Sequence, residues 1–396
     1  MKILVANIGS TSFKYRLFDM GGAVGQEREL ARGGADRIGQ TGGKVSWTIA
    51  GQSQTIECDC ADHGMAITAC LEQLTRGGVI ASATEISAIG FKAVMAGDSE
   101  PVCRVDEKLL ERMEYFVPIA PAHNPPYIAA MRMFAKTVPG IPLVAAFETG
   151  FHRTNPPRRQ RYAVPEEWAT KYGVRRYGFH GASHRYVSTR MAELTGRSDL
   201  RLISCHLGGS SSLCASVAGK SVATSMGLSP QSGLPQSNRA GDFDVFGLSL
   251  LGRQTGLSFE AMLKAMSGQG GLAALSGTTG DARDIENGLA KGDPRCQLAL
   301  DVFVTVVRDY LGAFLVEMGG ADAIAFTGGI GEKGPIWRQA ILKDLAFCGI
   351  HLDGQANEKT KTEGRIDAPG GSVQLWVVPT NEELIVARQA KALLEE

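Results

Sequence analysis

Three short runs rich in glycine and hydroxyl side chains each follow an apolar segment, and each could hold phosphate groups. Residues 7–14 offer free backbone N–H groups, three hydroxyls, one amide and one ammonium within eight residues. Residues 206–212 and 327–332 follow the apolar segments 201–205 and 323–326. Donors of this kind bind phosphate oxygens, but a polar hairpin turn explains residues 7–14 equally well.

Two histidines, His180 and His184, lie four residues apart in a glycine-rich segment. On one helix face this spacing could bind zinc, but no glutamate base lies between the pair and Gly178 and Gly181 argue against a continuous helix. The interpretation favoured here has Ser183 as the N-cap of a helix and His180 in the loop before it, near a transferred phosphate.

Three further polar positions have both a chemical and a structural interpretation. Arg239 lies among turn residues, where its planar fork could hold a carboxylate or phosphoryl group or could pair with Asp242 or Asp244. The charged turn at residues 281–284 could cap a helix or border a nucleotide. His123 precedes two prolines at a helix start, where it could cap, pack or reach a ligand.

The elements that must position these groups alternate between strands and helices. Strand, polar turn and strand occur over residues 2–18 and again over 201–217, which predicts two related domains. Helical patterns follow at residues 106–116, 126–135, 183–194, 297–318 and 382–394. The fold class is therefore predicted to be α/β, with residues 353–371 as a surface loop.

Length and charge narrow the class of function. A chain of 396 residues is long enough for two domains. Lys plus Arg and Asp plus Glu both total 41, so no net field favours nucleic acid or an anionic membrane. The apolar runs are shorter than a membrane span, and the eight scattered cysteines are expected to be reduced thiols. We expect a cytoplasmic protein that acts on small molecules.

Taken together and in order, these motifs resemble the acetate kinase family from Lys2 to the last helix. The matching blocks are residues 7–14, 120–125, 175–184, 206–208, 224–227, Arg239 with 241–242, 326–332 and 379–384.

The resemblance implies two duplicated actin-like ATPase (ribonuclease H-like) domains around a nucleotide cleft. Residues 1–150 would form an acceptor-side domain, on which the final helix at 382–396 packs back, and residues 151–381 would form the nucleotide-binding domain. The resemblance also implies a homodimer, Mg²⁺ as the metal, and ATP and a short-chain carboxylic acid as the substrates.

Roles for individual residues are carried over from the same resemblance. Asn7 and Glu382 would position Mg²⁺, Lys92 would bind the acceptor, and Glu148, His180, Arg239 and His123 would be catalytic. The ATP-binding residues would be Ser10, Ser12, Lys14, His206, Leu207, Gly208, Gly209, Ser210, Asp281, Ala282, Arg283, Gly329, Ile330, Gly331, Glu332 and Lys333.

The chain departs from the family where the acceptor should bind. The family has arginine at Lys92, histidine at Met95 and aspartate at Glu148. In the second phosphate turn, it has asparagine and glycine at the positions of Gly209 and Ser210. Lysine lacks the bidentate fork of arginine, so it would hold a carboxylate less directionally. The longer acid and the more slender base at Glu148 and Lys92 could be partners.

The predicted activity is reversible in-line phosphorylation of a short-chain carboxylate by ATP, with acetate as the expected acceptor. One alternative keeps this chemistry with a different or larger acid. Another is a nucleotide-binding regulatory protein with impaired catalysis. The small residues at 328–331 favour ATP over pyrophosphate as the donor, because adenosine could lie against the backbone there.

Overall fold

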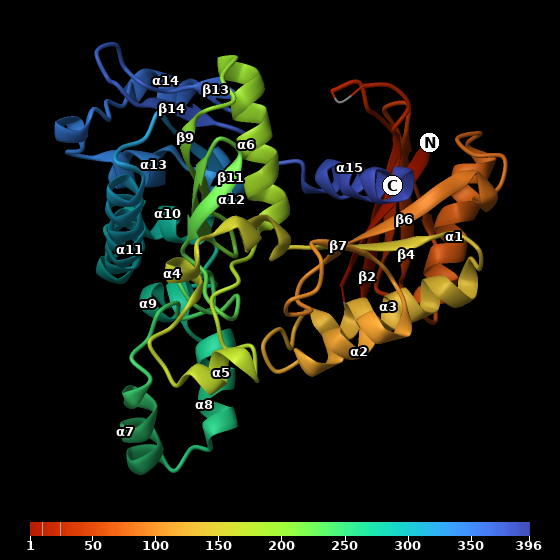
Figure 1. Ribbon diagram of the computed structural model, residues 1–396, viewed down its shortest axis with the longest axis horizontal. Helices are drawn as coiled ribbons and strands as arrows, with labels where there is room; N and C mark the ends of the chain where they lie inside the picture. Colours follow the sequence, from red (N-terminus) through yellow and green to blue (C-terminus); the bar gives the residue numbers. More distant parts are fainter. Residues whose placement is uncertain (10, 24) are drawn as a thin grey trace. The chain divides into compact units, whose positions relative to one another are not determined.

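A computed structural model describes residues 1–9, 11–23 and 25–396, which divide into two compact units (Figure 1). Unit 1 consists of Met1–Gly150 and Asn381–Glu396, and unit 2 consists of Phe151–Thr380. Each unit has a mixed β-sheet with helices packed against it, so the predicted α/β class is confirmed. Ser10, one of the predicted ATP-binding residues, lies outside the described residues.

The sheet of unit 1 has the strand order β5-β4-β3-β2-β1-β6-β8-β7. Its strands are β1 Lys2–Ile8, β2 Ser12–Asp19, β3 Arg28–Asp36, β4 Lys44–Ile49, β5 Gln52–Glu57, β6 Ile86–Ala93, β7 Val102–Arg104 and β8 Leu143–Phe147. Its helices are α1 His63–Arg76, α2 Glu107–Tyr115, α3 Asn124–Thr137 and α15 Glu382–Glu395, with a 3₁₀ turn at Ala83–Glu85.

The sheet of unit 2 has the order β11-β10-β9-β12-β14-β13. Its strands are β9 Arg201–His206, β10 Ser212–Val217, β11 Lys220–Thr224, β12 Ala323–Thr327, β13 Gly364–Arg365 and β14 Gln374–Val377. Its helices are α4 Pro157–Gln160, α5 Glu166–Thr170, α6 Gly181–Thr195, α7 Phe246–Thr255, α8 Phe259–Gly268, α9 Gly271–Ser276, α10 Ala282–Ala290, α11 Pro294–Met318, α12 Gly328–Lys333, α13 Pro335–Leu342 and α14 Gly354–Lys359. Two 3₁₀ turns occur at Gly150–Thr154 and Ala346–Cys348.

The two sheets repeat one topology. In unit 1, β3, β2 and β1 form an antiparallel meander, and β6 and β8 continue it in parallel. In unit 2, β11, β10 and β9 form the same meander, which β12 and β14 continue in parallel. The repeated strand–turn–strand pattern of the sequence is thereby confirmed. In both units the polar turn after the first strand joins it to the second.

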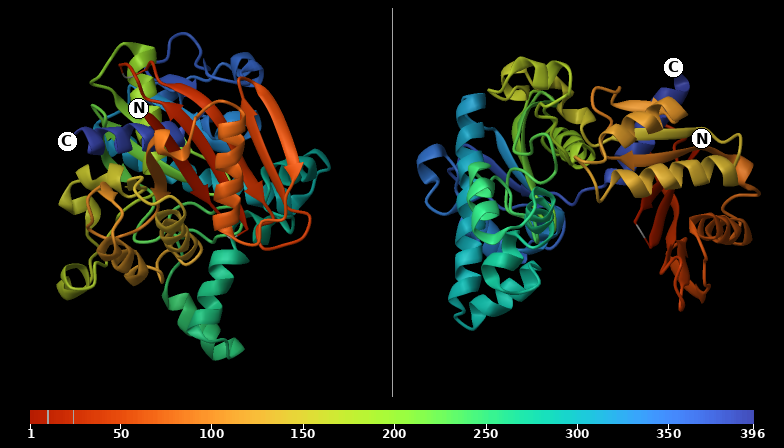
Figure 2. Two further views of the ribbon diagram at one scale, coloured as in Figure 1. Left: turned by 90° about the vertical axis from the view of Figure 1, so that its right-hand side faces the viewer. Right: turned by 90° about the horizontal axis from the view of Figure 1, so that it is seen from below.

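The apolar first strand of unit 1 is buried on both of its faces. Leu4, Ala6 and Ile8 contribute to a core that includes residues of α1, α2 and α3, while Ile3 and Val5 pack with α15 on the other face (Figure 2). The final helix approaches β6 so closely that a Cβ on Gly90 would lie 2.8 Å from Val386 Cγ1. Glycine at position 90 therefore permits α15 to pack against this sheet.

Most predicted helices begin at an acidic or amide cap. Asp106 accepts a hydrogen bond from the Leu109 N–H at the start of α2, and Asn381 accepts one from the Leu384 N–H at the start of α15. Residues 353–371 are not the plain surface loop that the sequence predicts. Asp353 caps the short helix α14, and β13 pairs with β14, so this segment extends the sheet.

No helix among the described residues is long and apolar enough to cross a membrane. All eight cysteines are free thiols.

Candidate active site

A polar cluster in unit 1 forms where parallel strands end. Lys92 lies near the end of β6, and Glu148 directly follows the neighbouring strand β8, its N–H donating to the Ala93 carbonyl over 2.9 Å. Glu382 is the first residue of α15, and its carboxylate pairs with the Lys92 ammonium. Lys92 thus pairs with Glu382, and the Glu148 carboxylate, the partner that the sequence suggested, also acts on it.

The charges in this cluster keep Lys92 protonated. Burial alone would lower the pKa of Lys92, but the Glu382 and Glu148 carboxylates more than offset it and raise that pKa above its ordinary value. Burial raises the pKa of Tyr127 to about 12, so its hydroxyl stays a donor at neutral pH. The cluster therefore presents a permanent ammonium at the predicted acceptor site.

Asn7 links this cluster to the first polar turn. It lies near the end of β1 opposite Lys14 on β2, and its Oδ1 accepts a hydrogen bond of 3.2 Å from the Tyr127 hydroxyl. Tyr127 is on α3, the helix that follows His123. Unit 1 thus contains Asn7, His123 and Lys92, as the sequence predicts. Tyr127 itself was missed, since no spacing in the sequence points from α3 to the end of β1.

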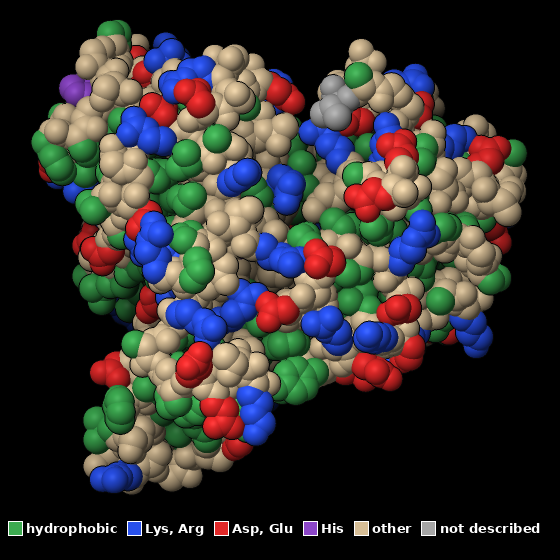
Figure 3. Space-filling model, viewed as in Figure 1, with side chains coloured by type: hydrophobic (Ala, Val, Ile, Leu, Met, Phe, Trp, Pro, Cys, Tyr) green, Lys and Arg blue, Asp and Glu red, His purple; other side chains and the backbone are tan. Residues whose placement is uncertain are grey.

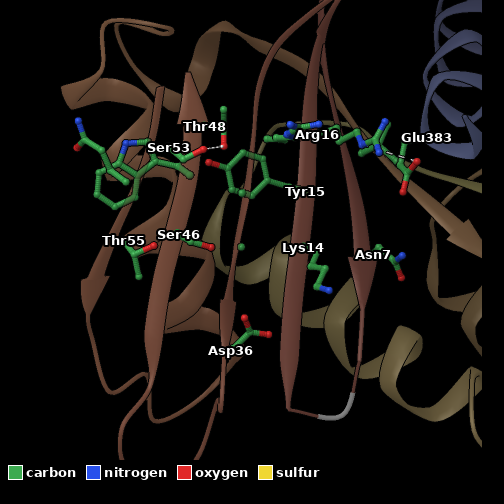
Figure 4. A pocket seen from close by; sticks show the side chains of 16 residues that line it. Asn7, Lys14, Tyr15, Arg16, Asp36, Ser46, Thr48, Ser53, Thr55 and Glu383 are labelled. Carbon is green, nitrogen blue, oxygen red and sulfur yellow. Dashed lines mark hydrogen bonds and ion pairs between the residues drawn. The ribbon is translucent and has the colours of Figure 1, made fainter. Parts of the chain in front are cut away.

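A cavity of about 420 Å³ lies against strands β1 to β5, lined by charged and hydroxyl side chains (Figure 4). Asn7 and Lys14 lie below Arg16 and Glu383 in this view, and hydroxyl side chains of β4 and β5 lie on the other side of the cavity. Lys14 is exposed. Ser12, at the start of β2, closes the turn by accepting from the Gly9 N–H over 2.9 Å.

The histidine motif of unit 2 differs from the expectation in its helix start. Helix α6 begins at Gly181, and its N-cap is His180, not Ser183. His180 has φ 57° and ψ 29°, the left-handed conformation, which is strained for a residue with a side chain. Ser183 lies in the first turn and its hydroxyl contacts His206 Nδ1 at 2.8 Å. The contact of Ser183 with His206 at the end of β9 outweighs the preference of serine for the N-cap position.

The His180 ring stacks on the His206 ring, with 4.3 Å between ring centroids and 25° between planes. His206 ends β9 and starts the second glycine turn. His184, one turn further along α6, is fully buried and contacts Ser204 and Ser212. Both rings contact the Ser212 hydroxyl, and among the described residues no group of three His, Cys, Asp or Glu side chains is placed to hold a zinc ion.

The second and third glycine turns meet at the ends of two neighbouring parallel strands. Thr327 pairs with His206, and the N–H groups of Ile330 and Gly331 donate to the Leu207 carbonyl over 2.8 and 3.0 Å. Gly328 has φ +76°, and a Cβ on it would lie 2.6 Å from that same oxygen, so only glycine fits there. The predicted ATP-binding residues 207–210 and 329–333 are thus brought together. Glu332 accepts from the Gly328 N–H over 3.0 Å and caps its own short helix.

Arg239 joins the second turn from a separate loop. Its Nη1 donates to Gln236 Oε1 at 3.2 Å, to the Pro230 carbonyl at 3.3 Å and, more weakly, to Ser210 Oγ at 3.5 Å. All three acceptors are neutral, and within residues 1–9, 11–23 and 25–396 Arg239 forms no ion pair. Burial lowers the pKa of Arg239, with no carboxylate to offset it. A largely buried guanidinium without an anion is expected where an anionic ligand binds.

The charged turn at residues 281–283 borders the same region. A Cβ on Gly280 would lie 2.2 Å from the Ser237 carbonyl oxygen, so this turn runs beside the loop of Arg239. Asp281 caps α10 and pairs with the exposed Arg283 guanidinium, whose side chain holds the pKa of Asp281 down at about 2. Ala282 begins the helix. Gln236, which connects Ser210 to Arg239, was missed because nothing in its spacing singles it out.

Buried histidines should make unit 2 sensitive to acid. Burial lowers the pKa of His152 to about 4, whereas an unfolded histidine titrates near 6.5. As pH falls from 6.5 to 4, the unfolded chain takes up a proton that the folded chain excludes, so stability falls by up to roughly 3 kcal/mol. Urea unfolding across this range should show the loss, and His152→Gln should reduce the slope. Equal slopes for the two proteins would contradict this account.

Comparison with known proteins places this geometry among kinases of small carboxylic acids. The model of the "Acetokinase family" matches residues 2–388. An acetate kinase of Heliobacterium modesticaldum is 41% identical over 401 residues, which cover 100% of both chains. The crystal structure of Porphyromonas gingivalis acetate kinase has a TM-score of 0.89 at 35% identity, covering 99% of each chain. A propionate kinase from Francisella tularensis has the same TM-score of 0.89 at 31% identity and 98% coverage of each chain.

Proposed function

Because the chain belongs to the acetate kinase family, we propose that it transfers the γ-phosphoryl group of ATP to the carboxylate of a short-chain acid, acetate first. The observation that carries the proposal is the partly buried Arg239 guanidinium, held by neutral acceptors next to the glycine turn at residues 207–210. Such a group is suited to the negative charge that is spread over the equatorial oxygens of a phosphoryl group in transfer.

In the proposed reaction a carboxylate oxygen of the acid attacks the γ-phosphorus in line. The bond from that phosphorus to the bridging oxygen breaks, and ADP leaves with the electron pair. A carboxylate is a competent nucleophile at neutral pH, so no base is needed, and catalysis consists of positioning and charge neutralisation. Lys92 would hold the acid, while His180 and Arg239 would neutralise the phosphoryl oxygens, with His123 and Glu148 near the acceptor.

The turns of both units would bind ATP. In unit 2, the backbone N–H groups and small residues of the two adjoining turns suit the nucleotide and its phosphates, and residues 281–283 would border them. In unit 1, the exposed Lys14 ammonium would reach the phosphates from β2. Ser12 closes the turn before it.

We propose Mg²⁺ as the metal, held by Asn7 and Glu382. Among the described residues no three His, Cys, Asp or Glu side chains are placed to hold a metal. Mg²⁺ commonly keeps several waters and takes one or two protein oxygens with substrate phosphates, so an amide and a carboxylate joined to one polar cluster fit it. The ion would supply neutralisation of charge on the phosphates.

Acyl phosphate formation tests the proposal directly. With Mg-ATP, acetate and hydroxylamine, the protein should produce acetyl hydroxamate, and a panel of longer acids should show whether the buried Met95 and Lys92 alter acceptor choice. Propionate is the first alternative, since one close structure is a propionate kinase. ATP binding without hydroxamate from any acid would refute the kinase proposal and favour a regulatory nucleotide-binding protein.

We propose that the enzyme is a homodimer joined through α7 and α8. Phe246 is 80% exposed, Leu250 is 62% exposed and Phe259 is 55% exposed. Figure 3 shows hydrophobic side chains in its lower left part, where α7 and α8 lie. Monomers rarely expose apolar side chains so densely. Light scattering should give the mass of a dimer, and Phe246→Lys with Leu250→Lys should give a monomer. Phe347→Lys, at an equally exposed phenylalanine elsewhere in unit 2, should leave the mass unchanged; a dimer surviving the double substitution would exclude this surface.

We further propose that the enzyme acts in the cytoplasm, where ATP is available. Fractionation of cells should recover it with soluble cytoplasmic proteins, and recovery elsewhere would contradict this assignment.

A further inference from the structure

A line of hydrogen-bonded side chains runs from His180 into the interior of unit 2. His180 Nδ1 lies 2.8 Å from Ser212 Oγ, and the same hydroxyl lies 2.8 Å from His184 Nε2. His184 Nδ1 in turn lies 2.7 Å from Ser204 Oγ. Ser212 and His184 have no exposed surface, and Ser204 is 1% exposed. Water therefore has no access to these three groups, and they must satisfy one another.

His184 is neutral, so its two ring nitrogens cannot both donate, and donors and acceptors must alternate along this row of hydrogen bonds. Burial lowers the pKa of His184 well below its usual value, and the nearby His152 and His206 lower it further. A neutral imidazole has one N–H donor and one nitrogen lone pair. If one ring nitrogen of His184 donates, the other must accept, so the orientation at Ser204 determines the orientation at Ser212.

The Cys214 carbonyl, next to Ser204, determines which ring nitrogen of His184 carries the proton. The Ser204 hydroxyl has the Cys214 carbonyl as an acceptor at 3.5 Å, a long hydrogen bond in which only the hydroxyl can donate. Ser204 Oγ then accepts from His184 Nδ1–H, and His184 Nε2 accepts from the Ser212 hydroxyl. Since that hydroxyl has given its one proton to His184, it must accept from His180, which places a proton on His180 Nδ1.

We propose that Ser212 and His184 are positioning residues that keep a proton on Nδ1 of His180, so that Nε2 is the nitrogen that takes up a proton from solvent and, in the cationic ring, donates it in a hydrogen bond to the moving phosphoryl group. The second half of this statement rests on the proposed function, and the first half does not. In the neutral ring Nε2 would carry a lone pair and could not donate to a phosphoryl oxygen. Only the cationic ring would offer an Nε2–H donor together with a positive charge.

Nuclear magnetic resonance of the ¹⁵N-histidine-labelled full chain tests the tautomer without any substrate. At alkaline pH, where histidines are neutral, long-range ¹H–¹⁵N spectra should show the His180 proton on Nδ1, with His180→Asn used to assign the signal. Free imidazole side chains in water favour the proton on Nε2, so the result expected is opposite to the default. Ser212→Ala should return His180 to the Nε2 tautomer, and Ser212→Thr, which keeps the hydroxyl, should retain Nδ1.

Ser216→Ala is the matched control, because Ser216 lies on the same strand and face and is 1% exposed. It should leave the His180 tautomer unchanged. A proton on Nε2 in the unsubstituted protein, or a tautomer unchanged by Ser212→Ala, would overturn the proposal whether or not the protein is a kinase.

Kinetics then test the link to catalysis. Ser212→Ala should lower kcat for hydroxamate formation by about 10- to 100-fold, the range that applies when a group that orients a metal-bound imidazole is lost, with KM for ATP within about twofold. Ser216→Ala should keep kcat. A changed tautomer with unchanged kcat would refute the role of Nε2 in phosphoryl transfer, and absence of turnover in the unsubstituted protein would instead refute the proposed function.

Discussion

Replacing Arg239 with alanine should lower kcat for acyl phosphate formation about 10³-fold or more while leaving the midpoint of thermal unfolding unchanged or higher. An arginine that stabilises charge on a transferring phosphoryl group contributes about 10³- to 10⁵-fold to the rate. Its guanidinium in unit 2 is largely buried and faces Gln236, Pro230 and Ser210 without a carboxylate. Removing a buried charge that has no anionic partner relieves a desolvation cost, so activity and stability should change independently.

Two substitutions sharpen this test. Arg239→Lys keeps the charge but loses the planar fork, so it should recover only part of the rate. Arg197→Ala removes an exposed guanidinium that pairs with Asp199, and it should leave both hydroxamate formation and the unfolding midpoint unchanged. If Arg239→Ala retained kcat within about tenfold, or if its loss of rate came with a large loss of stability, Arg239 would be structural and not a transition-state group.

Replacing Glu382 with glutamine should destabilise the protein by about 3 kcal/mol and strongly reduce activity. The Lys92 and Glu382 side chains are 25% and 13% exposed, so removal of one partner leaves a largely desolvated ammonium. Breaking a buried pair costs about 3–5 kcal/mol, and the Glu148 carboxylate near Lys92 places this case at the low end. Denaturant unfolding and the hydroxamate assay measure the two effects.

The double variant Lys92→Met, Glu382→Gln separates stability from function. It removes both charges, so it should recover most of the lost stability but none of the activity. The Lys2–Glu85 pair offers a more exposed lysine–glutamate control in the same unit, and Glu85→Gln should cause no measurable change in unfolding. Strictly additive losses in the Lys92–Glu382 cycle would show that the two groups do not interact.

Local sequence was sufficient to predict the repeated architecture. The apolar strands at residues 2–8 and 201–206 and the glycine turns after them specify the same meander in both units, because strand pairing there depends on period and turn chemistry. The five helices predicted from apolar periodicity all form, with boundaries within a few residues of those expected, but α1, α7 and α8 were not predicted. The start of α6 and the elements within residues 353–371 also differ from the prediction, because contacts distant in sequence outweighed local preference there.

The sequence by itself determined which chemical groups the chain offers and the order of the elements that carry them, because periodicity and turn residues act locally. Only the tertiary structure decided their partners. It paired Lys92 with Glu382, 290 positions away, and joined Tyr127 to Asn7. It also linked His180 through Ser212 to His184. Such pairings depend on which strand ends and helix starts become neighbours in the folded chain, and burial then sets the charge and protonation of each group.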